Sequence, residues 1–353
     1  MTSGADPVTG CISRTATQGL RALLLFGLSL VLVACERPVD IGRVSGPTMG
    51  TVWSVQVGER PADLSLPALQ EDIEALLLRV NQQMSTYIAD SDLSRFNQAP
   101  PGTWQQIPEE FSEVLAASLT MAETSQGAFD PTVGPLVNLW GFGPEGRRSQ
   151  APDAGAVAAA RERVGWERID VRESGREIRQ PGELYLDFSA IAKGYAVDLI
   201  GEYLDARGVE GWLVDIGGDM RARGLKPDGE PWRIGIERPV NGQRQVHSVV
   251  QPGDLAMATS GDYRNYFRDG DRQFSHTIDP RTAEPVDHGL VSVTVLHPSC
   301  MFADGYATLL TVLGPDEGLA FAQREGLAVL LISRDGEAFR EAMTEGFRER
   351  LAQ

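Results

Sequence analysis

Positive charge is scarce in this 353-residue sequence. Lysine and arginine together number 32 against 49 aspartate and glutamate residues, which gives a formal net charge of −17. A chain of this balance does not attract nucleic acid or anionic lipid to its surface as a whole. We therefore expect no nucleic-acid partner, and any phosphate ligand must be held locally by backbone N–H groups, a few cations or a metal.

Long apolar runs are also missing. The longest, Ala22–Ala34, has 13 residues and follows Arg14 and Arg21, whereas a spanning helix needs about 20. A short apolar run behind positive charges is typical of a signal peptide. It ends in Leu-Val-Ala-Cys at Cys35, which resembles the lipobox of bacterial lipoproteins; an uncleaved anchor is the alternative.

The lipobox resemblance implies that residues 1–34 are a signal peptide and that Cys35 becomes the lipidated first residue. The mature chain would then be anchored by lipid in the cell envelope, on the periplasmic side. We expect the inner membrane; the outer membrane is the alternative, because Glu36 is not the aspartate often linked to inner-membrane retention. Residues 35–47 would be a tether and residues 48–353 a single compact catalytic unit.

Cysteine is scarce too, with three in the chain. If Cys11 leaves with the signal and Cys35 is lipidated, Cys300 has no partner, so no disulfide framework supports the fold. Hydrophobic residues make up 42% of the sequence, which is ordinary for a globular protein.

Apolar periodicity predicts a mixed α/β (α+β) fold with largely antiparallel sheets and helices packed on them. Glycine- and proline-rich turns separate the expected strands in the second half of the chain, as in an antiparallel meander. The expected helices are 67–84, 108–125, 153–164, 190–207, 301–313 and 315–325, and the expected strands are 51–57, 184–188, 211–216, 232–237, 245–250, 255–259, 273–278, 290–296 and 327–333.

Several familiar signatures are absent. Gly217-Gly218 follows an expected strand, but the spacing of a dinucleotide-binding fingerprint is missing. Nothing matches a zinc site or a nucleophile elbow.

The stretch Leu184–Ile200 (LYLDFSAIAKGYAVDLI) is the most informative part of the chain. It predicts a strand that runs into a helix with Ser189 as the N-cap. Free N–H groups at such a helix start attract anions, usually phosphate, and Lys193 adds a positive charge one turn in. The same pattern is also common in plain scaffold.

Three carboxylates, Asp130, Asp187 and Asp304, stand beside turns. Asp304 and Thr308 are four residues apart, so they share one helix face and offer hard oxygen ligands suited to Mg²⁺. A capping aspartate with a back-bonding threonine is the alternative. His276, one of four histidines, lies in an expected strand, where a lone histidine is usually structural.

The order of eight motifs resembles the ApbE-type FAD:protein FMN transferases, which are commonly periplasmic lipoproteins. The resemblance runs from about Thr48 to the C-terminus. The motifs are TMGT (48–51), MSTY (84–87), GAFDPTVGPLVNLWGFGP (127–144), LDFSAIAKGYAVD (186–198), DIGGDMRARG (215–224), TSGDYRNYF (259–267), SHTIDPRT (275–282) and ADGYAT (303–308).

The resemblance implies a role for each matching position. The positions implied to contact FAD, the substrate, are Met49, Tyr87, Ala128, Phe129, Asp130, Asp187, Lys193 and Ile278. The implied Mg²⁺ ligands are Asp304, Thr308 and the backbone carbonyl of Ala190, and His276 matches a histidine with a catalytic role. Ala307 stands where some relatives have aspartate, which leaves one or two metals open.

The reaction implied is Mg²⁺-dependent transfer of FMN from FAD to a threonine hydroxyl of an acceptor protein, with release of AMP. We expect the acceptor to be a membrane redox subunit. A metal on the pyrophosphate would stabilise the leaving AMP. Threonine is a weak nucleophile, so a base is needed, either His276 or an aspartate. FAD hydrolysis to FMN and AMP, and flavin binding without catalysis, are the competing interpretations.

Overall fold

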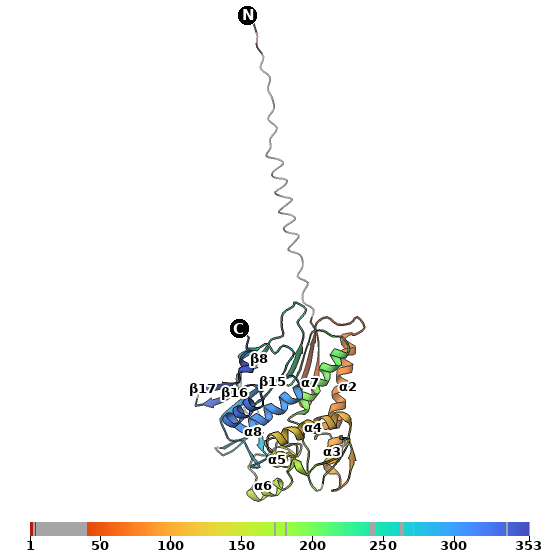
Figure 1. Cartoon of the computed structure of the whole chain (residues 1–353), viewed down its shortest axis with the longest axis vertical. Coiled ribbons are helices and arrows are strands. Elements are labelled where there is room, and N and C mark those ends of the chain that lie inside the picture. The colour runs from red at the N-terminus through yellow and green to blue at the C-terminus, as the bar shows by residue number, and fades with distance from the viewer. Residues whose placement is uncertain are drawn as a thin grey trace. The chain divides into compact units, whose positions relative to one another are not determined.

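An eight-stranded sheet organises residues Ile41–Gln353 in this computed structural model (Figure 1). The structure describes residues 1–2, 4, 41–172, 174–180, 182–240, 245–261, 265–270, 272–336 and 338–352. All neighbouring strands are antiparallel, as predicted. In spatial order they are β1 (Gly42–Thr48), β2 (Thr51–Val57), β6 (Trp212–Ile216), β7 (Asp219–Arg223), β10 (Ala256–Gly261), β15 (Leu290–His297), β16 (Ala328–Asp335) and β17 (Ala338–Met343).

Helices α7 and α8 cover one face of this sheet. α7 contacts β6 and β7, α8 contacts β10, β15 and β16, and the two helices also pack on each other. The helices are α2 (Leu66–Met84), α3 (Asp92–Gln98), α4 (Glu109–Thr124), α5 (Gly134–Leu139), α6 (Ala154–Arg161), α7 (Ala192–Ala206), α8 (Cys300–Arg324) and α9 (Glu345–Arg348). α8 contains the two helices expected there, which meet at a kink where Gly314 has a φ of 78°.

The sheet is buried on both faces near its centre. In β16, Val329 and Leu331 join the main core under α7 and α8, whereas Leu330 and Ile332 join a second cluster on the opposite face. This alternation follows from the two-residue period of a strand. It explains why the β16 sequence is continuously apolar.

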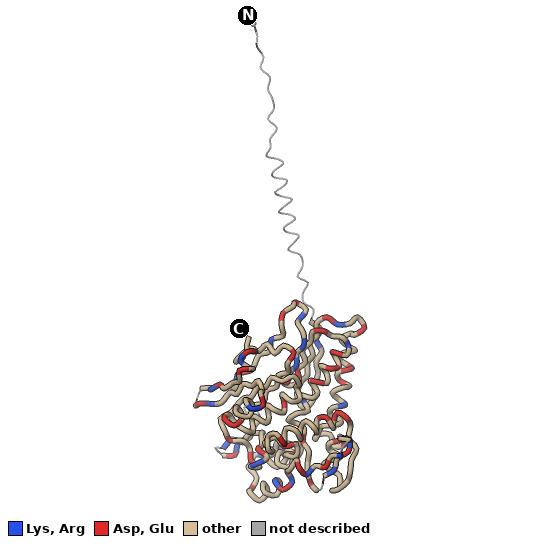
Figure 2. The backbone as a smooth tube through the Cα atoms, viewed as in Figure 1, with Lys and Arg blue, Asp and Glu red and all other residues tan. Residues whose placement is uncertain are grey.

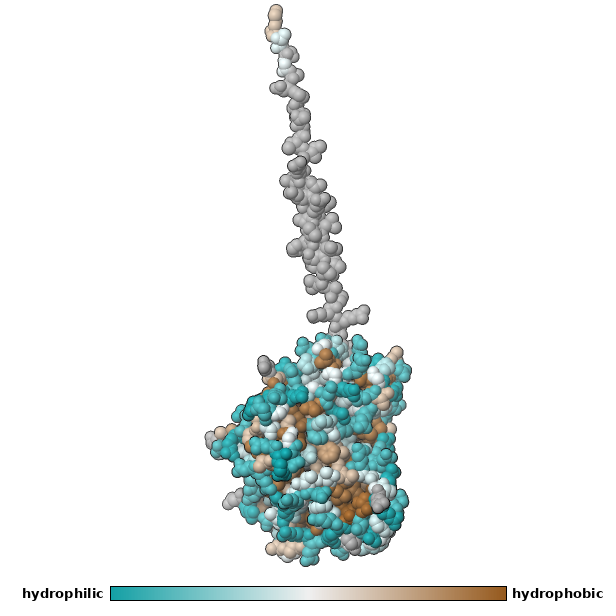
Figure 3. All heavy atoms as spheres, viewed as in Figure 1, coloured by the Kyte–Doolittle hydropathy of each residue, from teal (hydrophilic) through white to brown (hydrophobic). Residues whose placement is uncertain are grey.

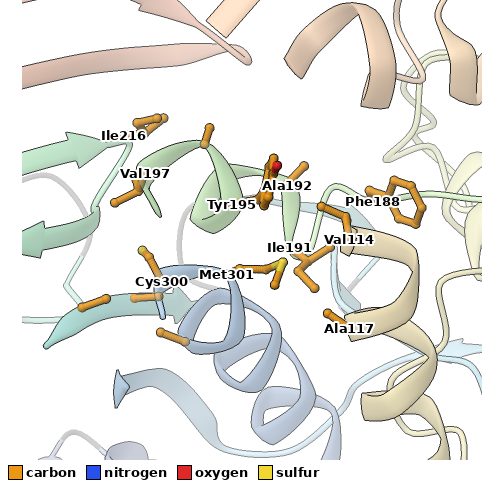
Figure 4. Close-up of a cluster of buried hydrophobic side chains, with 14 of the residues drawn as sticks. Val114, Ala117, Phe188, Ile191, Ala192, Tyr195, Val197, Ile216, Cys300 and Met301 are labelled. Atoms are coloured by element: carbon orange, nitrogen blue, oxygen red, sulfur yellow. The ribbon is translucent and has the colours of Figure 1, made fainter. Parts of the chain in front are cut away.

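In the main core, residues of α4 and α8 and of the turn into α7 lie together. Ile191 and Tyr195 lie near Met301 of α8 and Val114 of α4 in the close-up of Figure 4. Gly194 allows this packing, because a Cβ there would lie 2.2 Å from the carbonyl oxygen of Cys300. The role of Gly194 in the structure is therefore helix packing.

Short strands build the periphery. They are β3 (Gln105–Gln106), β4 (Asp170–Val171) and β5 (Glu177–Arg179) in one sheet, and the pairs β8 (Ile234–Glu237) with β9 (Val246–Val250), β11 (Tyr266–Asp269) with β12 (Arg272–Ser275), and β13 (Ile278–Asp279) with β14 (Glu284–Pro285). Along the described backbone, acidic and basic residues are interspersed (Figure 2). The face drawn in Figure 3 is mainly hydrophilic, with scattered hydrophobic patches.

Two sequence predictions need correction. Residues 42–47, expected to be tether, belong to strand β1, which pairs with β2 along its whole length. The segment 184–188 has no regular secondary structure and is not a strand. Cys35 and most of the expected signal peptide (residues 3 and 5–34) lie outside the described residues. In the described chain, no helix is long and apolar enough to cross a membrane.

Candidate functional site

A cavity of about 670 Å³ lies between the β1–β2 turn, the end of α2 and the start of α7. It brings together four residues expected to contact FAD: Met49, Tyr87, Asp187 and Lys193. Its remaining lining is Gly50, Val80, Asn81, Met84, Ser85, Thr86, Ile88, Ser189 and Ala192. The volume falls within the range of about 300–1,000 Å³ that is usual for small-molecule sites.

Met49 reaches this cavity because of the tight turn that joins β1 to β2. Thr48 pairs with Thr51, so Met49 and Gly50 form a two-residue turn, with φ angles of 46° and 70°. Positive φ at both positions is the geometry that matches the twist of a hairpin. A non-glycine residue held at positive φ beside a cavity is a strained feature of the kind found at binding sites.

Asp187 lies in a segment without regular secondary structure. The backbone N–H groups of this segment donate to a side chain and to a loop carbonyl instead of to a neighbouring strand. The N–H of Leu186 donates to Asn97 Oδ1 at 2.7 Å, and that of Asp187 donates to the Pro131 carbonyl at 2.8 Å. Leu184, Leu186 and Phe188 are buried in the core. The alternating pattern was therefore real, but side chains and loops satisfy the backbone in place of a strand partner.

The start of α7 also differs from the prediction. The helix begins at Ala192 with Ile191 as its N-cap residue, and the N–H of Ser189 donates to Asp187 Oδ1 at 2.8 Å. The N–H of Gly194 donates to Asp304 Oδ2 at 3.1 Å. The expected anion position at this helix start is thus filled in part by the protein's own carboxylate.

Lys193 is shared by two buried carboxylates. Its Nζ lies 3.1 Å from both carboxylate oxygens of Asp304 and also contacts Asp219. Burial disfavours the charged lysine, but the two carboxylates outweigh burial and raise the pKa of Lys193. Burial, followed by repulsion from Asp219, raises the pKa of Asp304 to about 7, although Lys193 opposes this shift.

The oxygen donors expected to hold Mg²⁺ come from α8 and the turn before α7. Thr308 lies one turn beyond Asp304 in α8, with its Oγ1 3.4 Å from Ser260 Oγ. Ala190 lies in the turn that precedes α7. Among the described residues, no group of three or more His, Cys, Asp or Glu side chains could hold a metal.

These donors nevertheless fit a hard cation. One carboxylate, one hydroxyl and one carbonyl, completed by water and phosphate oxygens, suit Mg²⁺. Asp219 and Asp304 carry two negative charges against the single positive charge of Lys193, so a negative charge is left over. The ammonium of Lys193 already contacts the carboxylate of Asp304. An incoming cation must displace this ammonium or share the carboxylate with it.

His276 lies between β12 and β13 and does not line the cavity. Its Nδ1 lies 3.1 Å from the carbonyl oxygen of Asn265, and its ring meets that of Phe142 edge-on. Desolvation lowers the pKa of His276, and repulsion from the Lys193 ammonium lowers it further. The histidine is therefore neutral at pH 7 and within electrostatic range of the cavity's lysine.

Four residues expected to contact FAD lie outside the cavity lining. Ala128 and Phe129 are buried in the main core, and Ile278 belongs to a small cluster under α5 and α6. Asp130 Oδ1 accepts from the N–H and hydroxyl of Thr132, both at 2.7 Å. Burial raises the pKa of Asp130 to about 6. Their contact with FAD stays a prediction.

Sequence reasoning missed Asp219 and Ser260 as members of the site. Both stand inside motifs quoted for the family resemblance, DIGGDMRARG and TSGDYRNYF. The signal available for Asp219 was its place directly after Gly217-Gly218, where a tight turn delivers the next side chain to a fixed position.

Comparisons with known proteins show which family the chain resembles. The ApbE family model matches residues 49–331. A curated FAD:protein FMN transferase of Vibrio cholerae is 44% identical over 319 residues, covering 90% of this chain and 95% of the relative. That of Haemophilus influenzae is 39% identical over 336 residues, covering 94% and 97%.

A solved structure, the flavin transferase ApbE from Vibrio cholerae, superposes with a TM-score of 0.82 at 43% identity. The match covers 89% of this chain and all of that one. The family predicted from the eight motifs is confirmed: the chain belongs to the ApbE family.

Proposed function

We propose that the protein transfers FMN from FAD to a threonine hydroxyl of an acceptor protein, in a Mg²⁺-dependent reaction that releases AMP. The observation that carries the proposal is one cavity that unites Met49, Tyr87 and Asp187 with Lys193, whose ammonium is bonded to Asp304. The proposed flavin site and the proposed cation site therefore adjoin each other at Lys193.

FAD is held by complementary chemistry in this cavity. The methionines Met49 and Met84 offer adaptable apolar contacts, and Tyr87, which is 70% exposed, offers an aromatic face for stacking. Lys193 supplies positive charge for a phosphate. The expected contacts from Ala128, Phe129, Asp130 and Ile278 belong to the same proposal.

The transfer is a displacement at phosphorus. The threonine Oγ forms a bond to the phosphorus of the FMN phosphate, and the bond from that phosphorus to the bridging oxygen breaks. The electron pair leaves with AMP, and the threonine proton goes to a base. No oxidant or reductant is required.

His276 is the proposed base. With Nδ1 as the donor to the Asn265 carbonyl, Nε2 carries the free lone pair that can accept the threonine proton. The lowered pKa of His276 keeps this nitrogen unprotonated at neutral pH. Asp187, which lines the cavity, is the alternative base.

Asp304, Thr308 and the carbonyl of Ala190 are the proposed Mg²⁺ ligands. When bound, Mg²⁺ supplies positive charge that polarises the attacked phosphorus and stabilises the leaving phosphate. Two buried carboxylates beside one lysine provide the negative potential that draws a cation to these donors.

We also propose that Cys35 carries a lipid that anchors the enzyme on the periplasmic side of the cell envelope. A tethered enzyme would act on acceptors at the same membrane, such as redox subunits with a threonine exposed on that side.

One experiment separates this function from its competitors. The protein is incubated with FAD, Mg²⁺ and an acceptor carrying a reactive threonine, and the acceptor is analysed by intact mass. Transfer adds the mass of FMN less one water. Release of FMN and AMP with an unmodified acceptor would indicate a hydrolase, and FAD recovered unchanged would indicate a binding protein.

A further inference from the structure

The contact between Lys193 and Asp219 has no role in the reaction described so far. Asp219 is the first residue of β7 and its side chain is only 4% exposed. It does not line the cavity. Burying a charge is costly unless it is paired, and the ammonium of Lys193 is the charge that pairs with Asp219.

Lys193 and a metal ion compete for the same carboxylate. The Lys193 ammonium lies 3.1 Å from both oxygens of Asp304. A divalent cation bound to those oxygens would repel it. If Asp304 were its only partner, the ammonium of this 30% exposed side chain would then be left unpaired beside a divalent cation, which is unfavourable.

Asp219 offers Lys193 a second partner in a fixed place. Gly217 and Gly218, with φ angles of 63° and 102°, make the turn that begins β7, and Asp219 pairs with Ile216 across the hairpin. A Cβ at Gly217 would lie 2.8 Å from Thr51, so the turn is also packed against β2. Asp219 therefore stays in place when Asp304 changes its partner.

We propose that Asp219 is a positioning residue that retains the Lys193 ammonium when Asp304 binds the metal, so that lysine and cation share one site. The inference rests on the proposed Mg²⁺ site. With Lys193, Asp219 and Asp304 all ionised, their summed charge is minus one; it becomes zero without Asp219 and minus two without Lys193.

The test measures Mn²⁺ binding in the absence of FAD, with electron paramagnetic resonance as the readout. Asp219→Asn should weaken Mn²⁺ binding by about tenfold or more, because Lys193 then has Asp304 as its sole charged partner. Lys193→Met should bind Mn²⁺ more tightly than the parent. The double variant Asp219→Asn/Lys193→Met should return to within about threefold of the parent, since the competitor is gone.

The controls identify which idea fails. Asp198→Asn removes another buried aspartate, paired with Arg221 at 2.7 Å, and should leave Mn²⁺ affinity unchanged. If the parent binds no Mn²⁺, or Asp304→Ala binds it as well as the parent, the proposed metal site itself is wrong.

If the parent binds Mn²⁺ but Asp219→Asn binds equally well, only the role of Asp219 is overturned. The role is also overturned if the double variant stays as weak as Asp219→Asn, because Asp219 would then be a direct ligand or a structural support. Should Asp219→Asn not fold, Lys193→Met decides the matter: binding no tighter than the parent overturns the proposal.

Discussion

Lys193 Nζ lies 3.1 Å from both carboxylate oxygens of Asp304, although 111 residues separate the two in sequence. α7 carries the lysine and α8 carries the aspartate, and the close packing of the two helices at Gly194 brings them together. The family resemblance had assigned FAD to one and Mg²⁺ to the other. The structure places them in direct contact, so we expect a change in either to alter both proposed roles.

The first prediction concerns the metal ligands. Asp304→Ala and Thr308→Ala should each lose FMN transfer, with the aspartate variant more severely affected. A lost carboxylate removes a charge that nothing replaces, whereas water can replace a lost hydroxyl. Transfer is measured by intact mass of the acceptor over a Mg²⁺ titration. Thr308→Ser, which keeps the hydroxyl, is the matched control, and full activity of Asp304→Ala in EDTA would rule out the magnesium hypothesis.

The second prediction concerns FAD affinity. Lys193→Ala should weaken FAD binding roughly tenfold to a hundredfold, the range expected for loss of a charge-assisted hydrogen bond. The titration uses flavin fluorescence in EDTA, so that the lysine is measured without metal. Lys226→Ala removes a lysine paired only with Asp228 and should bind FAD normally. An unchanged affinity for Lys193→Ala would mean that its charge serves the carboxylates alone.

Regular elements with clear periodicity were predictable from the sequence. Strand β2 spans Thr51–Val57 as predicted, and α2 differs from its predicted bounds by one residue at the N-terminus. β1 was missed because its sequence, GRVSGPT, contains two glycines and a proline, which disfavour strands. β1 is an edge strand that pairs only with β2, and proline is tolerated at such an edge.

The site was predictable only in part. Positions in the quoted motifs led to Met49, Tyr87, Asp187 and Lys193, which the fold does bring to one cavity. The contact between Asp219 and Lys193 could not be predicted from sequence periodicity, because it depends on how a hairpin turn and two helices pack in three dimensions. Local patterns also misplaced the start of α7, where a tertiary bond from Gly194 to Asp304 takes part in satisfying the helix end.

The third prediction is a pH dependence of stability. Burial raises the pKa of Asp130 from 3.8 to about 6, so the folded state binds more protons than the unfolded state between these values. Its contribution to stability should therefore fall as pH rises from about 4 to about 6, by at most about 3 kcal/mol. Asp130→Asn keeps an oxygen for Thr132 but cannot titrate, so it should lack this fall.

Urea unfolding of the parent and of Asp130→Asn across this pH range measures the effect. The difference between the two curves is the relevant quantity, because Asp304 titrates with the same sign in both proteins. If the difference does not change with pH, Asp130 is ionised in the folded protein across the whole of this pH range.

The fourth prediction concerns targeting. Ala34-Cys35 should be the cleavage junction, since the apolar run ends there behind small residues. Cys35→Ser should give a protein without lipid that no longer fractionates with membranes. Cys300→Ser is the control, because that thiol is buried in the fold. Continued palmitate labelling of Cys35→Ser would disprove the lipobox interpretation.

The fifth prediction separates binding from chemistry at His276. His276→Ala should bind FAD within a few-fold of the parent, because the proposed role of the ring is to take the threonine proton and not to hold FAD. It should transfer FMN about 10²–10⁴-fold more slowly, the usual contribution of a general base. The parent rate should rise with pH and level off, with a midpoint below 6.5, because desolvation lowers the pKa of His276 and only the neutral ring accepts a proton. The variant should lack this step, and its deficit should shrink at high pH, where solvent base substitutes.

FAD titrations and single-turnover transfer at several pH values distinguish the two roles of His276. His247→Ala is the matched control, since His247 pairs with Glu341 at 3.0 Å on β9 and β17. Transfer by His276→Ala at the parent's rate would make Asp187 the better base, because that carboxylate lines the cavity. If only FAD affinity were lost, His276 would be a binding residue. Its Nε2, which does not contact the Asn265 carbonyl, would then contact FAD and would not accept the threonine proton.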